Sequence, residues 1–278
     1  MDEKNILERI HASYYQLTAA ERKVADFVLA QHDQVQFMSI SQLAEECGTA
    51  EATVSRFCRN LQLKGFNAFK IELARDYVVQ KKQEHSTDTL EGRSQEVGKL
   101  AHAAVDQTIE LMQPEKVCQA VDLLEKAPRV LCFGSGGSMI LASELANLFS
   151  TVSGKFFAIS DSHTQITATA TAQPGDVIIL FSYSGATTNS IQVLELAKQL
   201  GIATILITRF SKSPAATLAD VVLRCGSNEG PFQFGSVPAK IAQLIVTDIL
   251  FQEYCFRNPD SCEENIERIA GALSVKHL

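Results

Sequence analysis

No apolar run in the sequence approaches the roughly 20 residues that a membrane-spanning helix needs. The opening residues Met1-Asp2-Glu3-Lys4 are charged and lead into an amphipathic pattern, unlike the apolar centre of a signal peptide. These two absences argue against a membrane protein and a secreted one, so we expect the chain to stay in the cytoplasm. Hydrophobic residues make up 46% of the 278 positions, which suffices for one or two cores, and we expect two domains.

A Cys-x-x-Cys pair, the spacing typical of zinc and redox sites, is also missing. The cysteines are odd in number, and most lie within apolar periodic stretches. We therefore expect them to be reduced and buried as small apolar side chains, with a metal or disulfide role as the weaker alternative. Neither a metal nor a cofactor is expected. The seven cysteines are at positions 47, 58, 118, 132, 225, 255 and 262.

Positive charge is not in excess, since 25 Lys and Arg stand against 32 Asp and Glu for a net charge of −7. This balance argues against a protein that coats nucleic acid without selectivity. Residues 1–82 carry 11 residues of each sign, however, and within residues 54–82 seven basic side chains stand against two acidic ones. That stretch predicts a surface that faces phosphates, although a solvated helix face has the same composition. The basic residues are Arg56, Arg59, Lys64, Lys70, Arg75, Lys81 and Lys82.

Short helices are predicted for residues 5–77, because apolar positions recur there at helical spacing. Thr18 followed by Glu21 is a capping-box pattern that marks one helix start, and Ser39 followed by Gln42 marks another. Each start leads into an apolar face. The N-terminal part is therefore expected to be a small helical domain with its own core.

The run over residues 81–93 is polar and contains almost no apolar side chain, so we expect it to be a linker. We therefore expect a helical domain over residues 1–80 and a second domain over residues 94–278. Helical patterns over 94–112 and 115–126 open this second domain.

Apolar runs of strand length, alternating with helical segments, follow these two helices. Runs that are apolar throughout are typical of a parallel sheet buried on both faces. We therefore expect a doubly wound α/β domain with a five-stranded parallel sheet, whose ligands bind at the carboxyl ends of the strands. Helices over 238–257 and 260–275 are expected to close the domain. The five runs are Val130–Phe133, Phe156–Ile159, Val177–Phe181, Thr204–Ile207 and Val221–Leu223.

A further helix is predicted in the N-terminal domain after Gly48, a residue that tolerates the left-handed backbone of a turn. One face carries apolar residues at i, i+3, i+4 and i+7, and the other presents side chains that can bind base edges and phosphates. The pattern fits the recognition helix of a helix-turn-helix, and by spacing alone it fits a small helical bundle equally well. The inner residues are Val54, Phe57, Cys58 and Leu61, and the outward ones are Thr53, Ser55, Arg56, Arg59 and Asn60.

Residues 18–77 resemble the N-terminal domain of RpiR-type transcription regulators almost throughout. The segments that carry the resemblance are Thr-Ala-Ala-Glu-Arg-Lys-Val-Ala, Ser-Gln-Leu-Ala-Glu-Glu-Cys-Gly, Glu-Ala-Thr-Val-Ser-Arg-Phe-Cys-Arg and Lys-Gly-Phe-Asn-Ala-Phe-Lys. The resemblance implies a helix-turn-helix that binds a double-stranded DNA operator. It places Thr53, Arg56 and Arg59 toward DNA, with Lys64 and Lys70 near the DNA backbone.

One position departs from this family pattern. Ala50 stands where the family usually has a serine that caps the recognition helix. Thr49 is the alternative cap, so the sequence leaves the first residue of that helix open.

The segment Gly134-Ser135-Gly136-Gly137-Ser138 follows the first predicted strand and opens a helix. Small residues, free amides and hydroxyls at a helix N-terminus are suited to binding an anion. The segment is not a dinucleotide fingerprint, because Met139 stands where the third glycine of Gly-x-Gly-x-x-Gly would be, and a Walker lysine is missing. A tight turn without a ligand is the alternative.

A second loop of the same chemistry, Ser182-Tyr183-Ser184-Gly185-Ala186-Thr187-Thr188, follows the central strand and again opens a helix. Two such loops after adjacent strands converge on one crevice. Ser182 stands where a nucleophile elbow has its first glycine, and no His/Asp partnership is evident. We therefore expect these hydroxyls to bind a phosphate and not to act as nucleophiles.

These loops closely resemble those of the sugar isomerase (SIS) domain, and the resemblance covers about residues 129–250. It includes Pro174-Gly175-Asp176, Ser213-Pro214 and Ala219-Asp220. The resemblance implies a flavodoxin-like sheet that dimerises and holds a phosphorylated sugar. Many RpiR relatives have Ser-Arg near Ala239-Lys240-Ile241-Ala242-Gln243, so the sugar-facing side is expected to differ. The candidate ligands are Ser138, Ser182, Ser184 and Thr187 for the phosphate, together with Ser135, Gly136, Gly185 and Glu229.

An isomerase would need an acid/base pair, for which Glu229, His163 and Lys240 are the candidates. None of the three is marked by its spacing. A DNA-binding domain favours a sensor over an enzyme, because catalysis would destroy the signal being measured. We expect a non-enzymatic homodimer or dimer of dimers. The alternatives are a sugar-phosphate isomerase with an appended helical domain, and an interaction module that does not bind DNA, which the basic stretch disfavours.

Overall fold

The computed structural model describes residues 5–84, 89–227 and 236–274, except for the side chains of residues 76–84. The chain divides into two compact units, one built mainly from residues up to Lys99 and one from Leu100–Ser227 and from Val237 onward. The first is helical and the second is α/β, as predicted. Within the described ranges, no helix is long and apolar enough to span a bilayer.

Short helices make up the N-terminal unit, and both predicted capping boxes are present. The Thr18 hydroxyl accepts a hydrogen bond from the Glu21 amide while the Glu21 carboxylate accepts one from the Thr18 amide. Ser39 and Gln42 form the same reciprocal pair. Such a box satisfies amides that the first helical turn leaves without partners. The elements are α1 (Ile6–Ser13), the 3-10 helix η1 (Tyr14–Gln16), α2 (Ala19–Val35), α3 (Ile40–Glu46), α4 (Glu51–Asn60) and α5 (Phe66–Glu84).

One apolar core joins these helices and holds α4 by its inner face. Val54, Phe57, Cys58 and Leu61 are all buried, as their spacing predicts. Phe57 packs edge-on against Phe69 of α5, with ring centroids 5.5 Å apart. The helix is thus fixed from one side, and its opposite side is left to solvent.

A five-stranded parallel sheet forms the centre of the C-terminal unit, as predicted, with the strand order β2-β1-β3-β4-β5. This is the order of flavodoxin-like doubly wound folds. In such folds the chain leaves β1 and β3 toward opposite sides of the sheet, which opens a crevice at their carboxyl ends. The strands are β1 (Val130–Gly134), β2 (Phe156–Ile159), β3 (Val177–Phe181), β4 (Ala203–Thr208) and β5 (Val221–Arg224).

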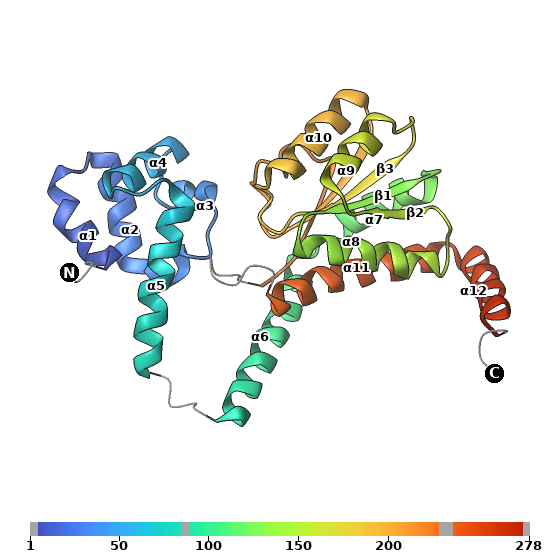
Figure 1. Cartoon of the computed structure of the whole chain (residues 1–278), viewed down its shortest axis with the longest axis horizontal. Helices are drawn as coiled ribbons and strands as arrows, with labels where there is room; N and C mark the ends of the chain where they lie inside the picture. Colours follow the sequence, from blue (N-terminus) through green and yellow to red (C-terminus); the bar gives the residue numbers. More distant parts are fainter. Residues whose placement is uncertain (1–4, 85–88, 228–235, 275–278) are drawn as a thin grey trace. The chain divides into compact units, whose positions relative to one another are not determined.

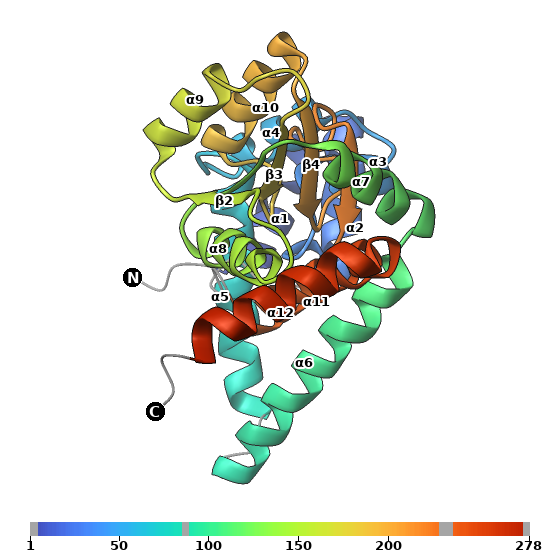
Figure 2. The same cartoon turned by 90° about the vertical axis from the view of Figure 1, so that its right-hand side faces the viewer.

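Helices cover both faces of this sheet, with α9 and α10 on one side and α8 and α11 on the other (Figure 1). Figure 2 shows the same layers after a quarter turn. Neighbouring strand residues enter different cores, so Cys132 belongs to the α8 side and Phe133 to the α10 side. The helices are α6 (Leu90–Leu111), α7 (Pro114–Lys126), α8 (Gly137–Ser150), α9 (Ser162–Ala170), α10 (Thr188–Leu200), α11 (Val237–Arg257) and α12 (Pro259–Ser274).

Cysteines contribute to these cores largely as expected, since those at positions 47, 58, 132, 225 and 262 are buried. Burial raises the pKa of the Cys58 and Cys132 thiols to about 12 each, so both stay protonated and unreactive at neutral pH. The expectation is wrong for Cys118, which is exposed on α7. It follows the buried Val117, and successive residues point about 100° apart around a helix.

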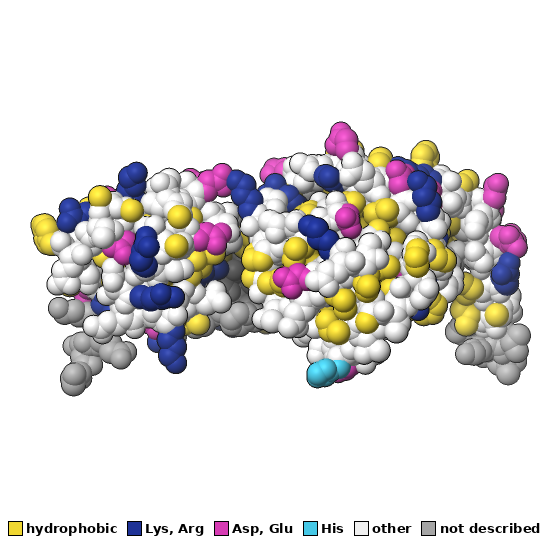
Figure 3. Space-filling view, turned by 90° about the horizontal axis from the view of Figure 1, so that it is seen from above, with side chains coloured by type: hydrophobic (Ala, Val, Ile, Leu, Met, Phe, Trp, Pro, Cys, Tyr) yellow, Lys and Arg dark blue, Asp and Glu magenta, His cyan; other side chains and the backbone are white. Residues whose placement is uncertain are grey.

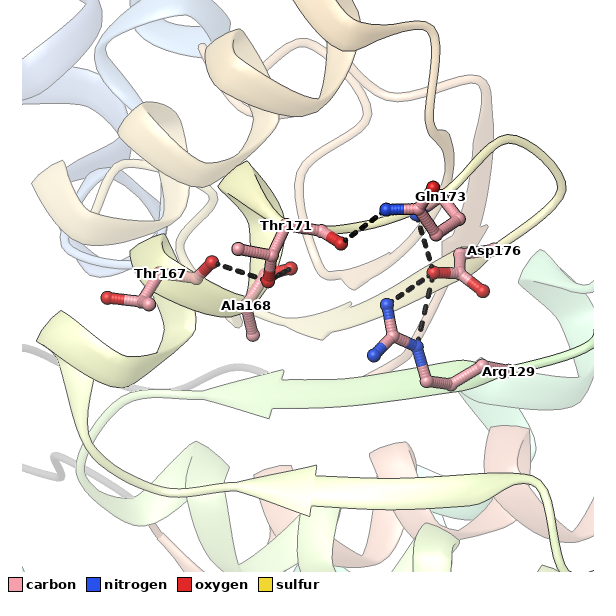
Figure 4. Close-up of polar contacts among 6 residues, drawn as sticks. All are labelled: Arg129, Thr167, Ala168, Thr171, Gln173 and Asp176. Atoms are coloured by element: carbon pink, nitrogen blue, oxygen red, sulfur yellow. Dashed lines mark hydrogen bonds and ion pairs between the residues drawn. The ribbon is translucent and has the colours of Figure 1, made fainter.

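The Pro-Gly-Asp motif before β3 has a structural role (Figure 4). Asp176 is 2% exposed and accepts hydrogen bonds from Arg129 Nε at 3.1 Å and from the Gln173 amide at 2.8 Å. Arg129 directly precedes β1 and Asp176 directly precedes β3, so the cluster lies at the amino ends of both strands. It joins β1 to β3 at the edge of the sheet opposite the predicted crevice.

The loop after β3 is fastened to the segment that follows β4. Gly185 has a left-handed φ of 60°, its amide donates to the Ser182 carbonyl at 3.0 Å, and its carbonyl accepts from the Ala215 amide at 2.9 Å. A Cβ atom on Gly185 would lie 1.9 Å from Ser213 Oγ. Glycine is therefore needed here both for its backbone conformation and for the space it leaves.

We predict that Gly185→Ala destabilises the protein more than Gly201→Ala. Gly201, with φ 67°, has no atom within 4 Å of an added Cβ, so its replacement carries only the left-handed backbone cost of about 1–2 kcal/mol. At Gly185 the clash with Ser213 adds an overpacking cost, for a total of roughly 2–5 kcal/mol. Urea unfolding of the two variants measures the difference. Equal losses would mean that Ser213 moves aside without cost.

Candidate functional site

The outer face of α4 presents the basic side chains that the sequence places there. Arg56 and Arg59 are exposed, and Ser55 is half-buried. Lys64 is exposed in the turn before α5. Figure 3 views this unit from the side on which α4 lies, and several Lys and Arg side chains are visible on that face. A helix that packs against the core by its inner face and carries such side chains on its exposed face is suited to enter a groove of DNA.

Thr53 does not lie on that outer face, and the expectation that it does is wrong. Its side chain is buried, with 5% of the residue exposed. Thr53 lies one turn before Phe57, so both point into the same core. The Thr53 hydroxyl accepts a hydrogen bond from Arg56 Nη2 at 3.2 Å. The buried Thr53 therefore helps to orient the exposed side chain of Arg56.

Asn60 and Lys70, two further candidates for DNA contact, have partners within the N-terminal unit. Asn60 Nδ2 donates to Glu21 Oε1 at 2.9 Å, which joins the end of α4 to the start of α2. Lys70 Nζ donates to the Met38 carbonyl at 3.0 Å. Both side chains thus hold neighbouring helices in place, and a contact with DNA would have to share or replace these bonds.

The start of α4 lies at Glu51, with Ala50 at the capping position and no side-chain cap. Thr49 does not take the role of the missing serine, because its hydroxyl donates to the Ala44 carbonyl at 3.5 Å. The Glu51 carboxylate accepts a hydrogen bond from the Ser41 hydroxyl, which joins α4 to α3. The first turn of α4 is therefore held by α3 and not by a cap of its own.

In the C-terminal unit, the two predicted loops lie at the carboxyl ends of the adjacent strands β1 and β3. Gly136 precedes α8 with a φ of 57°, and Thr187 precedes α10. Neither residue caps its helix with a side-chain hydrogen bond. Both helices therefore begin beside this edge of the sheet with the partial positive charge of their N-termini uncompensated by a cap.

Ser182 is the most informative residue of the site. It is 3% exposed, and its hydroxyl has no hydrogen-bond partner among the described residues. An unsatisfied buried hydroxyl costs about 1–3 kcal/mol, so such groups are rare unless a ligand or water completes them. The Ser182 carbonyl accepts a bond from the Gly185 amide at 3.0 Å, which holds the loop around the hydroxyl.

The other candidate hydroxyls lie on the same two loops. Ser184 and Thr187 are exposed, while Ser135 and Ser138 are half-buried. Asn189 Nδ2 lies 3.4 Å from Ser135 Oγ, so the start of α10 reaches the loop after β1. The two loops therefore converge, as the sequence predicts. Glu229 lies outside the described residues.

A buried amide that the sequence analysis missed holds this convergence together. Gln165 of α9 is fully buried, and its Nε2 donates to the carbonyls of Gly134 at 2.9 Å and Ile159 at 2.8 Å. Its Oε1 accepts from Asn189 Nδ2 at 2.7 Å. A glutamine amid Thr and Ala residues was the only signal, and it does not reveal which strands the amide joins.

Two arginines, also missed, lie at the same edge of the sheet. Arg209 follows β4, and its amide donates to the Tyr183 carbonyl at 3.0 Å. Arg224 ends β5, and its Nε atom is buried without a partner in the described part of the chain. Burial and the nearby Arg209 lower the pKa of the Arg224 guanidinium. The local charge is therefore favourable for an anion.

The residues considered for isomerase chemistry are not brought together by any bond within the described ranges. His163 is exposed near the start of α9, and Lys240 is half-buried on α11. Across the same ranges, no group of three or more His, Cys, Asp or Glu side chains is placed to hold a metal ion. The features that do converge are hydroxyls, amides and helix N-termini.

Comparison with known proteins agrees with both halves of this description. Residues 4–80 match the helix-turn-helix domain of the rpiR family, and residues 123–252 match the SIS domain. An uncharacterized HTH-type transcriptional regulator of Caldanaerobacter subterraneus subsp. tengcongensis is 31% identical over 278 residues, which is 99% of each chain. The HTH-type transcriptional regulator HexR of Escherichia coli K12 is 29% identical, covering 97% of this chain and 94% of HexR.

Among solved structures, the Vibrio vulnificus NanR protein complexed with ManNAc-6P is similar along nearly the whole chain. The TM-score is 0.84 at 26% identity, over 97% of this chain and 98% of NanR. The similarity therefore includes both units and not the SIS domain alone. On these grounds the chain belongs to the RpiR family of helix-turn-helix transcriptional regulators, in which the helix-turn-helix is joined to a SIS domain.

Proposed function

We propose that this regulator binds a phosphorylated sugar in its SIS domain and that the bound sugar changes its affinity for an operator. The observation that carries the proposal is the buried hydroxyl of Ser182, which has no partner among the described residues and lies on one of two converging loops that lead into helices without a side-chain cap. A phosphate group supplies what this site lacks, because its oxygens accept hydrogen bonds from hydroxyls and helix amides and its charge complements both helix ends. NanR, which is similar over nearly its whole length, was solved with ManNAc-6P.

The phosphate ligands in this proposal come from the two loops that converge at β1 and β3. Ser182 donates from the buried side, and the exposed hydroxyls of Ser184 and Thr187 from the open side. Ser135, Gly136, Ser138 and Gly185 complete the set through hydroxyls and backbone amides. We further propose that Glu229 contacts the sugar. The surface near Lys240 is where the sugar specificity is expected to differ from that of relatives.

For the N-terminal unit we propose that α4 enters the major groove of the operator. Arg56 and Arg59 are the residues expected to read base edges or phosphates, with Ser55 beside them and Lys64 at the DNA backbone. Asn60 and Lys70 are proposed as secondary contacts, because each already has a partner within the unit. Thr53 acts by orienting Arg56.

We propose a regulatory role without catalysis, in the cytoplasm, for a dimer or dimer of dimers whose domains are separated near residues 81–93. The relatives carry the names of regulators, and an enzyme acting on the effector would remove its own signal. A dimer is consistent with binding to an operator, because the two recognition helices of a helix-turn-helix dimer bind half-sites about 34–36 Å apart. Turnover of phosphosugars by the purified chain, followed by chromatography of the products, tests the isomerase alternative.

We predict that Arg56→Ala and Arg59→Ala each weaken specific operator binding by about 1–3 kcal/mol, the usual contribution of one good base contact. The operator is first selected by gel shift against genomic fragments, and affinities are then measured by fluorescence anisotropy. Arg268→Ala on α12 removes the same charge from an exposed position and is the matched control. Unchanged affinity in a folded double variant would remove α4 from the interface.

We predict opposite effects of Ser182→Ala on stability and on binding. Without ligand the variant should be as stable as the natural protein or more so, by up to about 1–3 kcal/mol, because an unsatisfied hydroxyl is removed. Phosphosugar affinity should fall by about 1.5–3 kcal/mol, the value of a hydrogen bond to a charged oxygen. Urea unfolding measures the first effect. Calorimetry with the phosphosugar that most raises the unfolding temperature measures the second.

Ser213→Ala is the control for the stability measurement. It also removes a buried serine hydroxyl, but one that accepts a hydrogen bond from the Ala216 amide at 3.3 Å, so it should destabilise the protein. The dephosphorylated sugar is the control for binding. If Ser182→Ala destabilises the unliganded protein, or if both sugars bind equally, the phosphate does not lie on Ser182.

We predict that a saturating phosphosugar shifts operator affinity by about 1–3 kcal/mol, or 5–150-fold, and that operator DNA shifts sugar affinity by the same factor. Anisotropy titrations with and without the sugar measure the shift. A fragment ending near Lys82 should bind the operator more weakly and ignore the sugar. An intact protein indifferent to every sugar that stabilises it would contradict the sensing role.

A further inference from the structure

The side chain of one residue in the loop after β3 contacts another part of the C-terminal unit. The Tyr183 hydroxyl donates to the Ser227 carbonyl at 2.9 Å. Arg209 Nε donates to the same carbonyl at 2.9 Å, and the Arg209 amide donates to the Tyr183 carbonyl. Tyr183 is therefore tied to Ser227 directly and through Arg209, while its neighbours Ser182 and Ser184 are candidate phosphate ligands.

Ser227 adopts a conformation that its side chain disfavours. Its φ is 75°, in the left-handed region where the Cβ atom of a non-glycine residue is crowded by the backbone. Only 5% of the residue is exposed, and its carbonyl and amide are both engaged. A strained residue persists when its surroundings over-determine it, so loss of one hydrogen bond releases part of the constraint. The Ser227 peptide is thus held in a strained conformation by the hydrogen bonds to its carbonyl and amide.

The other side of this turn rests on α6. The Ser227 amide donates to Gln107 Oε1 at 3.1 Å, and the Gly226 amide donates to the buried Thr108 hydroxyl at 2.9 Å. A Cβ atom on Gly226 would lie 2.6 Å from the Thr108 backbone nitrogen and 2.8 Å from the Ala104 carbonyl oxygen. The turn and the helix therefore pack backbone against backbone.

The chain enters the C-terminal unit through α6. The helix begins at Leu90, within the stretch assigned to the first unit, and continues to Leu111. Its second half carries Gln107 and Thr108. If Gln107 and Thr108 become more or less well ordered, the change therefore acts on the segment that connects the two units in sequence.

We propose that Tyr183 and the turn at Gly226–Ser227 transmit occupancy of the phosphate loop to α6, so that anion binding at Ser182 and Ser184 changes the stability of the helix at Ala104–Thr108. This inference rests on the proposed phosphate site and names the residues through which that site acts. Tyr183 is a positioning residue here and does not touch the anion. Coupling then requires only that the loop hold Tyr183 differently with and without its ligand.

Amide hydrogen exchange on the full-length protein tests the proposal, with inorganic phosphate as the probe and chloride at equal ionic strength as the reference. In the natural protein phosphate should slow exchange over residues 182–190 and, by about fivefold or more, over residues 100–111. In Tyr183→Phe the slowing over 182–190 should remain, while that over 100–111 should fall below about twofold. Tyr254→Phe is the matched control, since it removes the hydroxyl of a buried tyrosine on α11 that has no part in the proposed relay.

Gln107 gives an independent test if Tyr183→Phe folds poorly. Gln107→Ala removes the acceptor for the Ser227 amide and should abolish the response of α6, whereas Gln107→Glu retains an acceptor and should restore it. A response confined to residues 182–190 in the natural protein would overturn the relay and leave the phosphate site standing. No response in either segment would overturn the site itself. An undiminished α6 response in Tyr183→Phe and Gln107→Ala would also overturn the relay.

Discussion

The pairing of β1 with β3 is the interaction on which the rest of the C-terminal unit depends. Their register ends with Gly134 opposite Phe181, so the chain leaves both strands at neighbouring points and turns to α8 on one face and α10 on the other. Because both faces of the sheet are buried, a slip of one residue would exchange the side chains of the two cores, and the register is strongly determined. The hydroxyls that follow β1 and β3 are adjacent for this reason, and no further contact between the two loops is needed to bring them together.

The loops at this edge carry local constraints that an ordinary turn would avoid. Ser182 keeps a buried hydroxyl without a partner among the described residues. Gly136 and Gly185 take left-handed backbone, and a Cβ on Gly134 would lie 2.5 Å from the Ser138 carbonyl oxygen, so all three positions favour glycine. At the opposite edge, in contrast, the Asp176 carboxylate is satisfied by Arg129 and by a backbone amide. An unsatisfied hydroxyl and several positions that favour glycine at one edge, with a satisfied buried carboxylate at the other, are typical of a site whose remaining interactions come from a ligand.

The sequence was sufficient to predict the sheet, its helices and the convergence of the two loops, because each follows from local patterns. Strands buried on both faces are apolar throughout, and the capping boxes at Thr18 and Ser39 need only residues three apart. The predictions that Thr53 is exposed and that Cys118 is buried are wrong for one reason. Both residues lie at the border of the buried face of their helix, and the sequence does not show how wide that face is. Gln165 and Ser227 were missed because their roles depend on partners far away in sequence, such as Gly134 and Tyr183.

A sensor differs from a rigid binding protein because it needs an element with two states. The free-energy difference between these states must be about as large as the binding free energy that the ligand can contribute. The left-handed strain at Ser227, about 1–2 kcal/mol, is similar to the 1–3 kcal/mol typical of coupling between two sites. A stronger strain would keep the turn released whether or not a ligand is bound, and an unstrained residue would have no alternative to favour. The glycine before it lets the turn approach the α6 backbone, so a small change in one peptide acts directly on that helix. Within the proposed relay, the same fold without this contact would keep the candidate phosphate site but would have no route from that site into α6.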